Sequence, residues 1–188
     1  MPSAPGPAHP EDPYDLDFTS LVEGPASPPS PPPTPEFEEN ALIGANALGE
    51  EGFHVVLVRP RPGSPANHVV MIVDDDAPTA ELASHFLRKA GYPTVVALGA
   101  RDAARLMTRL GPPELLLLDV EMPEMGGLEF LARIRRHKRL FDTPVVLFTA
   151  HAAQTDIVRG LQAGADGYIA KPIAASALVA AVKTVLGH

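Results

Sequence analysis

Four short apolar runs, each followed by a polar residue, constrain the fold of this chain more than any other feature of its sequence. The polar ends are Asp74 after 69–73, Asp119 after 115–118, Thr149 after 145–148 and Lys171 after 168–170. Short apolar runs bounded by turn signals are typical of buried strands in a parallel sheet. Since ligands bind at the carboxyl edge of such sheets, we expect these four side chains to form one site.

The composition changes abruptly near residue 68. Residues 1–68 hold 15 of the 22 prolines and ten acidic residues, against the two bases Arg59 and Arg61, whereas residues 69–188 balance 13 acids with 13 bases. We therefore expect a Pro-rich acidic extension over 1–68 and one folded domain over 69–188. Residues 1–52 have too few apolar side chains to offset the entropy of ordering and are predicted to be disordered. A short strand is possible at 53–58, and whether it docks on the domain is left open.

Several classes of protein are disfavoured by what the sequence lacks. No cysteine is present, which excludes disulfides, thiolate metal sites and thiol nucleophiles. The sequence shows no secretory signal and no run of about 18 apolar residues that would span a membrane. No basic face stands out for nucleic acid. We expect a cytoplasmic protein without direct nucleic-acid or membrane contact.

From residue 69 onward, strand patterns alternate with amphipathic helical patterns. Strands are predicted at 69–74, 93–97, 115–119, 145–149 and 167–170, and helices near 77–90, 100–110, 128–139, 152–163 and 173–186. Leu82, Phe86 and Ala90 share one face of the first helix. Five such units predict an α/β fold, a doubly wound parallel sheet covered on both faces.

Four motifs along residues 69–188 resemble those of the receiver domain of bacterial two-component response regulators. They are Val73-Asp74-Asp75, the segment 118–127 around Asp119, the segment 146–150 ending in Thr149-Ala150, and the segment 164–172 ending in Lys171-Pro172. The separations of 44, 30 and 22 residues between Asp75, Asp119, Thr149 and Lys171 also fit. The resemblance implies a flavodoxin-like sheet of five parallel strands in the order 2-1-3-4-5.

The resemblance also implies a role for each polar residue of the site. Asp119 is expected to be the phosphoacceptor, because a carboxylate can form an acyl phosphate. Lys171 and Thr149 are expected to assist at the phosphoryl group. Mg²⁺ is expected to be held by oxygen atoms from Asp74, Asp75, Asp119 and the backbone carbonyl of Glu121. Thr149 and Tyr168 are expected to form the switch, with Tyr168 turning inward after phosphorylation.

The implied partners are a histidine kinase or a phosphotransfer domain as the phosphoryl donor. Since the sequence ends at His188, soon after the last predicted helix, no DNA-binding output domain is expected. Output is expected through the face made by 152–163, 167–170 and 173–186, or through the N-terminal tail. Gly167 stands where receivers that pair across this face often carry an acidic residue, which argues against such a dimer.

The tail itself contains one amphipathic pattern. Tyr14, Phe18, Leu21 and Val22 would lie on one face of a helix. An acidic segment with such a stripe can fold into the groove of a partner. Docking onto the receiver itself, or no contact at all, are the alternatives that the sequence leaves open.

Two other functions compete with a non-enzymatic receiver that carries an aspartyl phosphate. One is a scaffold that keeps the fold but works without phosphorylation. The other is a phosphatase with Asp119 as the nucleophile, for which Glu121 stands two residues later, where a general acid is needed.

Five basic residues at the end of the third helix are interpreted as surface charges near a helix C-terminus. They are Arg133, Arg135, Arg136, Lys138 and Arg139.

Overall fold

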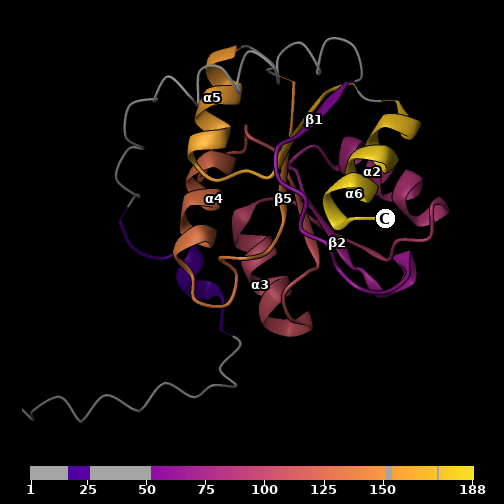
Figure 1. Ribbon diagram of the computed structural model, residues 1–188. Coiled ribbons are helices and arrows are strands. Elements are labelled where there is room, and N and C mark those ends of the chain that lie inside the picture. Colours follow the sequence, from indigo (N-terminus) through magenta and orange to yellow (C-terminus); the bar gives the residue numbers. More distant parts are fainter. Residues whose placement is uncertain (1–16, 26–51, 151–153, 173) are drawn as a thin grey trace, which may run out of the picture.

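A computed structural model of the protein describes residues 17–25, 52–150, 154–172 and 174–188. This part of the chain forms one six-stranded sheet with helices on both faces (Figure 1). The strands are β1 (Phe53–Val55), β2 (Val70–Val73), β3 (Thr94–Ala97), β4 (Leu115–Leu118), β5 (Val145–Thr149) and β6 (Gly167–Ala170). The helices are α2 (Ala77–Lys89), α3 (Ala100–Leu110), α4 (Gly127–Arg136), α5 (Gln154–Gln162) and α6 (Ala175–Leu186).

The order of the strands across the sheet is β1-β6-β5-β4-β2-β3. Strands β2 to β6 are parallel to one another, so the predicted fold and its 2-1-3-4-5 strand order are confirmed. The central strands β2 and β4 are buried along their whole length. Their uninterrupted apolar sequences suit strands that are covered on both faces.

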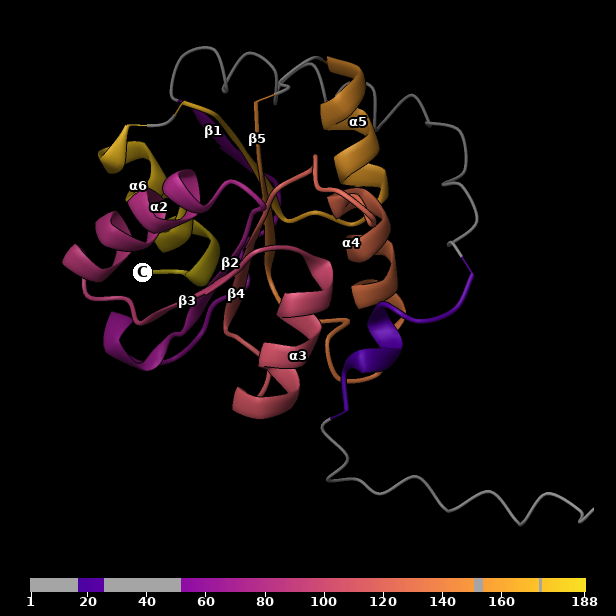
Figure 2. The same ribbon diagram turned by 180° about the vertical axis from the view of Figure 1, so that it is seen from behind.

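Helices α2 and α6 cover one face of the sheet, and α3, α4 and α5 cover the other (Figures 1 and 2). The apolar face of α2 differs from the prediction: Ala80, Ala83 and Leu87 are buried, whereas Leu82 is 54% exposed. Small alanine side chains let the helix approach the sheet closely, and the larger Leu82 lines a surface pocket instead. Phe86 lines the same pocket but also packs against the core, as predicted.

The helix predicted at 128–139 ends earlier, because α4 stops at Arg136 and His137 takes an extended backbone conformation. The chain then turns, with the amide of Leu140 donating to the carbonyl of His137. This turn buries Leu140 completely. A helix that continued past residue 136 would not follow the turn that brings Leu140 into the core.

Residues 53–61, here called the strap, pack against the edge of the parallel sheet. β1 pairs antiparallel with β6, with Val55 opposite Gly167 and His54 opposite Tyr168. The amides of Val56 and Leu57 both donate to the carbonyl of Asp166. The strand that the sequence allowed at 53–58 is therefore present only over 53–55, and it docks on the folded domain.

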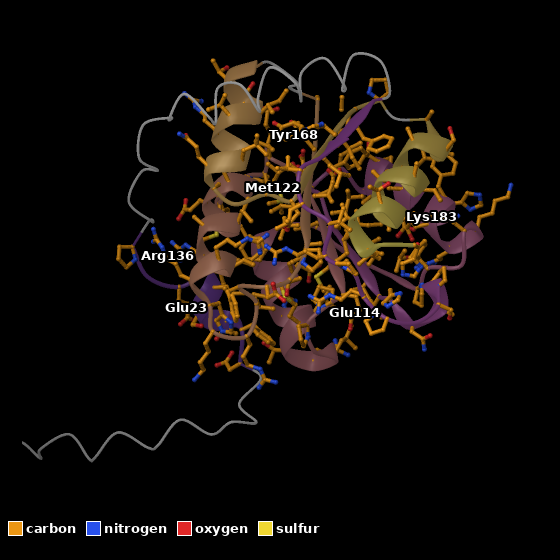
Figure 3. All side chains as sticks on the ribbon, in the orientation of Figure 1. Glu23, Glu114, Met122, Arg136, Tyr168 and Lys183 are labelled. Carbon is orange, nitrogen blue, oxygen red and sulfur yellow. The ribbon has the colours of Figure 1, made fainter. Side chains whose placement is uncertain are left out.

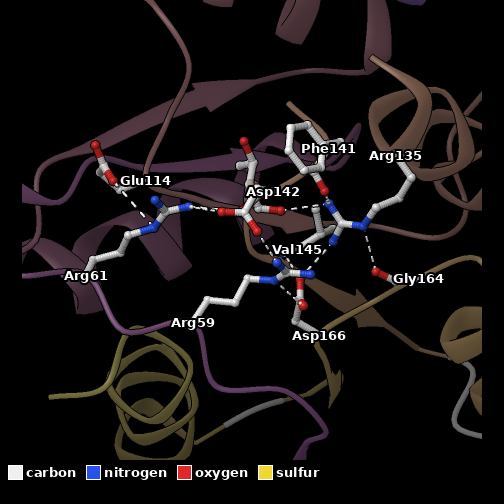
Figure 4. Close-up of polar contacts among 10 residues, drawn as sticks. Arg59, Arg61, Glu114, Arg135, Phe141, Asp142, Val145, Gly164 and Asp166 are labelled. Atoms are coloured by element: carbon white, nitrogen blue, oxygen red, sulfur yellow. Dashed lines mark hydrogen bonds and ion pairs between the residues drawn. The ribbon is translucent and has the colours of Figure 1, made fainter. Parts of the chain in front are cut away.

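A group of ion pairs fixes the end of the strap (Figure 4). Asp166 is buried and accepts hydrogen bonds from Arg59 Nε at 2.6 Å, Arg135 Nη2 at 2.7 Å and the amide of Val145 at 2.8 Å. Arg59 also pairs with Asp142. A buried carboxylate requires such compensation, so Asp166 joins the strap, α4 and β5 in one polar cluster.

Residues 17–25, here called the docked turn, lie against α3 and α4 on the other side of the domain, around the 3-10 helix η1 (Thr19–Leu21) (Figure 1). This order differs from the predicted disorder of residues 1–52, most of which lie outside the described part. The reason is that Phe18 and Leu21 pack against apolar residues of α3 and α4 and become buried. Among the described residues, no helix is long and apolar enough to cross a membrane.

Candidate functional site

Three aspartates lie together at the carboxyl edge of the sheet. Asp74 and Asp75 follow β2, Asp119 follows β4, and these two strands are neighbours. One carboxylate oxygen from each residue lies within 4.8 Å of the others. Asp74 and Asp119 are buried, whereas Asp75 is exposed. The edge therefore presents a compact group of negative charge with one side open to solvent.

Lys171 supplies the positive charge at this edge. Its Nζ lies 2.7 Å from Asp74 Oδ2 and 3.2 Å from Asp119 Oδ1. The same ammonium lies 4.8 Å from the ring centroid of Phe148, and this cation–π contact limits where it can move. Its backbone amide donates to the carbonyl of Thr149 at 2.7 Å. The ends of β5 and β6 thus hold Lys171 beside both buried carboxylates.

The backbone around Asp119 is fixed on both sides. Its amide donates to the carbonyl of Val73 at 2.8 Å, and its Oδ1 accepts from the amide of Val120 at 2.9 Å. A Cβ atom at Gly127 would lie 1.9 Å from the carbonyl oxygen of Asp119, so only glycine fits where the loop returns to start α4. The loop after β4 is therefore shaped around this aspartate.

The electrostatic environment of Asp119 is mixed. Burial raises the pKa of its carboxyl above the usual value, Lys171 opposes that rise, and the neighbouring Asp74 adds to it. The carboxylate stays available as a nucleophile because Lys171 compensates its charge. Replacement of this lysine would leave two buried carboxylates facing each other.

Thr149 and Tyr168 lie next to this group on β5 and β6. Thr149 is fully buried at the end of β5. Tyr168 is also buried, on the side of the sheet that α5 covers (Figure 3). A Cβ atom at Gly160 of α5 would lie 2.9 Å from the Tyr168 ring, so glycine makes room for it. Burial, followed by the charges of Asp156 and Asp119, raises the pKa of Tyr168. Tyr168 was expected to turn inward after phosphorylation, but its ring already points inward here.

The structure tests the other predictions for this site only in part. The side chain of Glu121 is exposed, and the role of its backbone carbonyl as a metal ligand stays a prediction. Residues 151–153 lie outside the described part.

Two important residues were missed: Arg133 and Arg135 were interpreted as surface charges, but they hold the docked turn and Asp166. Only their position in a basic run hinted at them.

The three carboxylates fit a hard divalent cation. Mg²⁺ prefers oxygen ligands and is usually bound by one or two carboxylates, with water and phosphate oxygens completing the shell. Asp75 is exposed to solvent beside the buried Asp119, so water and phosphate oxygens have access from that side. The donor set therefore suits Mg²⁺.

The profile of the response regulator receiver domain matches residues 70–183 of the sequence. This match covers more than half of the chain, and the protein belongs to the response regulator receiver domain family. The resemblance of its four motifs to this family is confirmed. A phosphoryl-accepting aspartate and a Mg²⁺ ion bound at an acidic cluster are general features of the family.

Individual relatives agree with this assignment. The phosphate regulon transcriptional regulatory protein PhoB of Pseudomonas aeruginosa is 36% identical over 117 residues, which cover 62% of this chain and 51% of PhoB. The chain thus spans about half the length of the curated relatives it matches. Chemotaxis protein CheY4 of Vibrio cholerae is similar in structure, with a TM-score of 0.60 and 28% identity over 63% of this chain and 98% of that chain. The signal receiver domain of a signal transduction histidine kinase from Syntrophus aciditrophicus is also similar in structure. Its TM-score is 0.58 and its sequence identity is 35%, over 64% of this chain and 90% of that chain.

Proposed function

We propose that this protein accepts a phosphoryl group on Asp119 from a phosphohistidine of a histidine kinase or a phosphotransfer protein. The observation that carries the proposal is the position of Asp119: it ends β4 with Lys171 Nζ at 3.2 Å and the carboxylates of Asp74 and Asp75 beside it. A single aspartate at the end of a strand would not by itself indicate phosphoryl transfer. A nucleophile, a cation and a cluster of oxygen ligands at one edge suit phosphoryl transfer.

In the proposed reaction, a carboxylate oxygen of Asp119 attacks the phosphorus atom. The P–N bond to the donor imidazole breaks, its electron pair returns to the nitrogen, and an acyl phosphate forms on Asp119. Lys171 holds the carboxylate ionised before the transfer and pairs with phosphoryl oxygens after it. When bound, Mg²⁺ neutralises charge on the phosphoryl oxygens. Asp75, Asp119 and the backbone carbonyl of Glu121 would hold the ion, and Asp74 would assist in binding it.

Thr149 and Tyr168 are proposed to transmit the modified state. The phosphoryl group adds about −1.5 to −2 charges at this edge, which attract the ammonium of Lys171 and the hydroxyl of Thr149. Thr149 ends β5, Tyr168 lies within β6, and these two strands pair with each other, so a shift at Thr149 is felt at Tyr168. Since Tyr168 is already buried, we propose that the signal is a change in the packing of β6 and α5 rather than the entry of this ring.

The output contact is proposed to involve the face formed by α5, β6 and α6, together with the strap that covers the free edge of β6. The strap presents Val56, Leu57 and Val58, whose side chains are nearly half exposed. Contiguous exposed apolar residues mark sites of protein contact. A downstream partner would therefore meet the strap before it meets β6.

Incubation with acetyl phosphate and Mg²⁺, followed by intact mass spectrometry, tests the proposal. We expect the mass of one phosphoryl group to be added to the wild type and to Asp76→Asn, an exposed neighbour used as the matched control. The variant Asp119→Asn should gain no mass, and Mg²⁺ removal by a chelator should also prevent the addition. An undiminished adduct in Asp119→Asn would remove the central claim.

The same experiment separates the two alternative functions. A chain that never gains the phosphoryl mass, yet signals normally as Asp119→Asn in cells, would be a scaffold. Hydrolysis of a phosphate ester without a detectable adduct, lost in both Asp119→Asn and Glu121→Gln, would indicate a phosphatase.

A further inference from the structure

The docked turn occupies a groove between α3 and α4 that the proposed function does not use. In Figures 1 and 2 this indigo segment lies against one end of α4 with α3 nearby. Phe18 is 0% exposed and Leu21 is 2% exposed, although both come from a tail of nine described residues. Both side chains join the apolar cluster that also contains Met107 of α3 and Ile134 of α4. Two apolar anchors thus enter the core from outside the domain.

The Phe18 end of the groove has specific polar and aromatic contacts. The amide of Phe18 donates to Thr108 Oγ1 at 2.9 Å, and that hydroxyl donates to the carbonyl of Ala104 at 3.0 Å. The ring of Phe18 lies 5.1 Å from the ring of His137 at an angle of 51°. Tilted rings at this separation interact favourably. The groove therefore recognises an aromatic side chain together with its own backbone amide.

The other end of the groove recognises the backbone of the turn. Arg133 donates from Nη1 to the carbonyls of Leu21 and Glu23, and from Nη2 to those of Gly24 and Pro25, over 2.9 to 3.3 Å. Glu129 Oε1 accepts from Arg133 Nη2 at 2.8 Å and orients the guanidinium. Leu21 is the last residue of the 3-10 helix, and Glu23, Gly24 and Pro25 follow it, so these carbonyls have no helical partner and the guanidinium satisfies them. This clamp selects a turn that ends there, whatever its side chains.

We propose that the groove between α3 and α4 is a peptide-binding site for a helical turn with Phe and Leu three residues apart, and that the docked turn is its reversible ligand within the same chain. The contact is much smaller than a standard protein interface, so the same turn binds weakly when it is presented by another molecule. Attachment to the same chain raises its effective concentration to about the millimolar range, which keeps the groove filled. The proposal is independent of phosphorylation at Asp119.

The test is binding of a fluorescent peptide that spans residues 17–25, followed by anisotropy. Full-length protein with Phe18→Ala and Leu21→Ala has an emptied groove and should bind the peptide saturably. Wild-type protein should bind at least tenfold more weakly, because its own turn competes. Adding Arg133→Ala to the double variant should abolish binding, whereas Arg136→Ala, an exposed neighbour on the same helix, should leave it unchanged. A peptide with Phe18→Ala should not bind.

A second measurement needs no substitution in the protein. Excess unlabelled peptide added to the wild type should accelerate hydrogen exchange of the Phe18 amide, because the tail leaves the groove. Failure of the peptide to bind the double variant, or equal binding to the wild type, would overturn the proposal. A wild-type dimer that the peptide dissociates into monomers would also overturn it, since the occupant would then be the turn of a second copy.

Discussion

The two segments that precede the receiver, the docked turn and the strap, both lie against it, but opposite kinds of interaction hold them. The docked turn contributes its own apolar side chains and receives a cation from the domain, through Arg133. The strap pairs through its backbone and contributes its own cations, with Arg59 reaching the buried Asp166 of the domain. The docked turn therefore depends on its own apolar anchors and on a cation of the domain, whereas the strap depends on backbone pairing and on a carboxylate of the domain.

The backbone pairing of the strap explains why a glycine stands at position 167. A Cβ atom at this position would lie 3.0 Å from the carbonyl oxygen of His54 and 3.6 Å from the Cα atom of Val55. The strap thus needs a residue without a side chain here. A side chain at this position, acidic or not, would meet the strand that lies over it.

The largest effect is expected for Asp166→Asn, which removes the buried negative charge that the strap shares with α4. The variant leaves the guanidinium groups of Arg59 and Arg135 without a buried negative charge, at a cost of roughly 3 kcal/mol in the free energy of unfolding. Urea denaturation measures this change. The matched control Asp142→Asn removes a carboxylate that is 60% exposed and should cost less than about 1 kcal/mol. Equal effects of the two variants would show that the buried cluster is not special.

A smaller and more local effect is expected for Gly167→Val. Valine is favoured in strands, so the parallel sheet keeps its stability, but the side chain meets the backbone of the strap. Hydrogen exchange of the Val56 and Leu57 amides should rise by roughly tenfold or more, while amides of β2 keep their protection. The amide of Phe18 should not change, because the docked turn does not depend on this position. Unchanged protection of Val56 would contradict the proposed role of Gly167.

Phe18→Ala is expected to have the opposite effect, because it should release the docked turn and leave the strap in place. Loss of the buried ring weakens docking of the turn by about 2 kcal/mol, so exchange at residues 17–25 increases while the strap stays protected. The matched control is Ser20→Ala on the same turn, whose exposed side chain should matter little. If Phe18→Ala also released the strap, the two segments would dock as one unit and the comparison would fail.

The smallest effect concerns pH. Burial, followed by the charges of Lys138 and Arg139, lowers the pKa of His137, whose ring packs on Phe18. Its Nδ1 also accepts from the amide of Arg139, a bond that protonation at this atom would break. The ring of Phe18 adds to the burial of His137, so docking favours the neutral histidine and the docked state has its full stability above about pH 6.5, the value of a solvated histidine. Docking should therefore weaken as the pH falls below about 6.5. Exchange at the Phe18 amide, corrected for its intrinsic pH dependence, measures this change, and His137→Phe should remove it.

The sequence predicted the parallel sheet and the group of polar residues at its edge. Runs such as 115–118 are apolar throughout and end in a polar residue, and these are local signals that do not depend on distant parts of the chain. Once the strand order is given, the positions of Asp74, Asp119 and Lys171 follow, because parallel strands deliver their carboxyl ends to one edge.

Local signals also misled in identifiable places. Leu82 was placed on the packing face of α2, but it is 54% exposed because the distance to the sheet favours the smaller Ala80 and Ala83. Phe86, placed on the same face, does pack against the core. The helix predicted to reach residue 139 ends at Arg136, because the burial of Leu140 requires a turn that no helical pattern reveals.

The sequence alone thus determined the receiver fold and the acidic cluster with Lys171 at the edge of its sheet, whereas the tertiary structure decided where the extension lies. Arg133 contacts a carbonyl 112 residues away, and Arg59 contacts a carboxylate 107 residues away. Such pairings have no periodicity, since they depend on which groove and which strand edge the folded domain leaves open. Composition predicted a disordered tail because only the folded receiver supplies the apolar surface that Phe18 and Leu21 lack in their own segment.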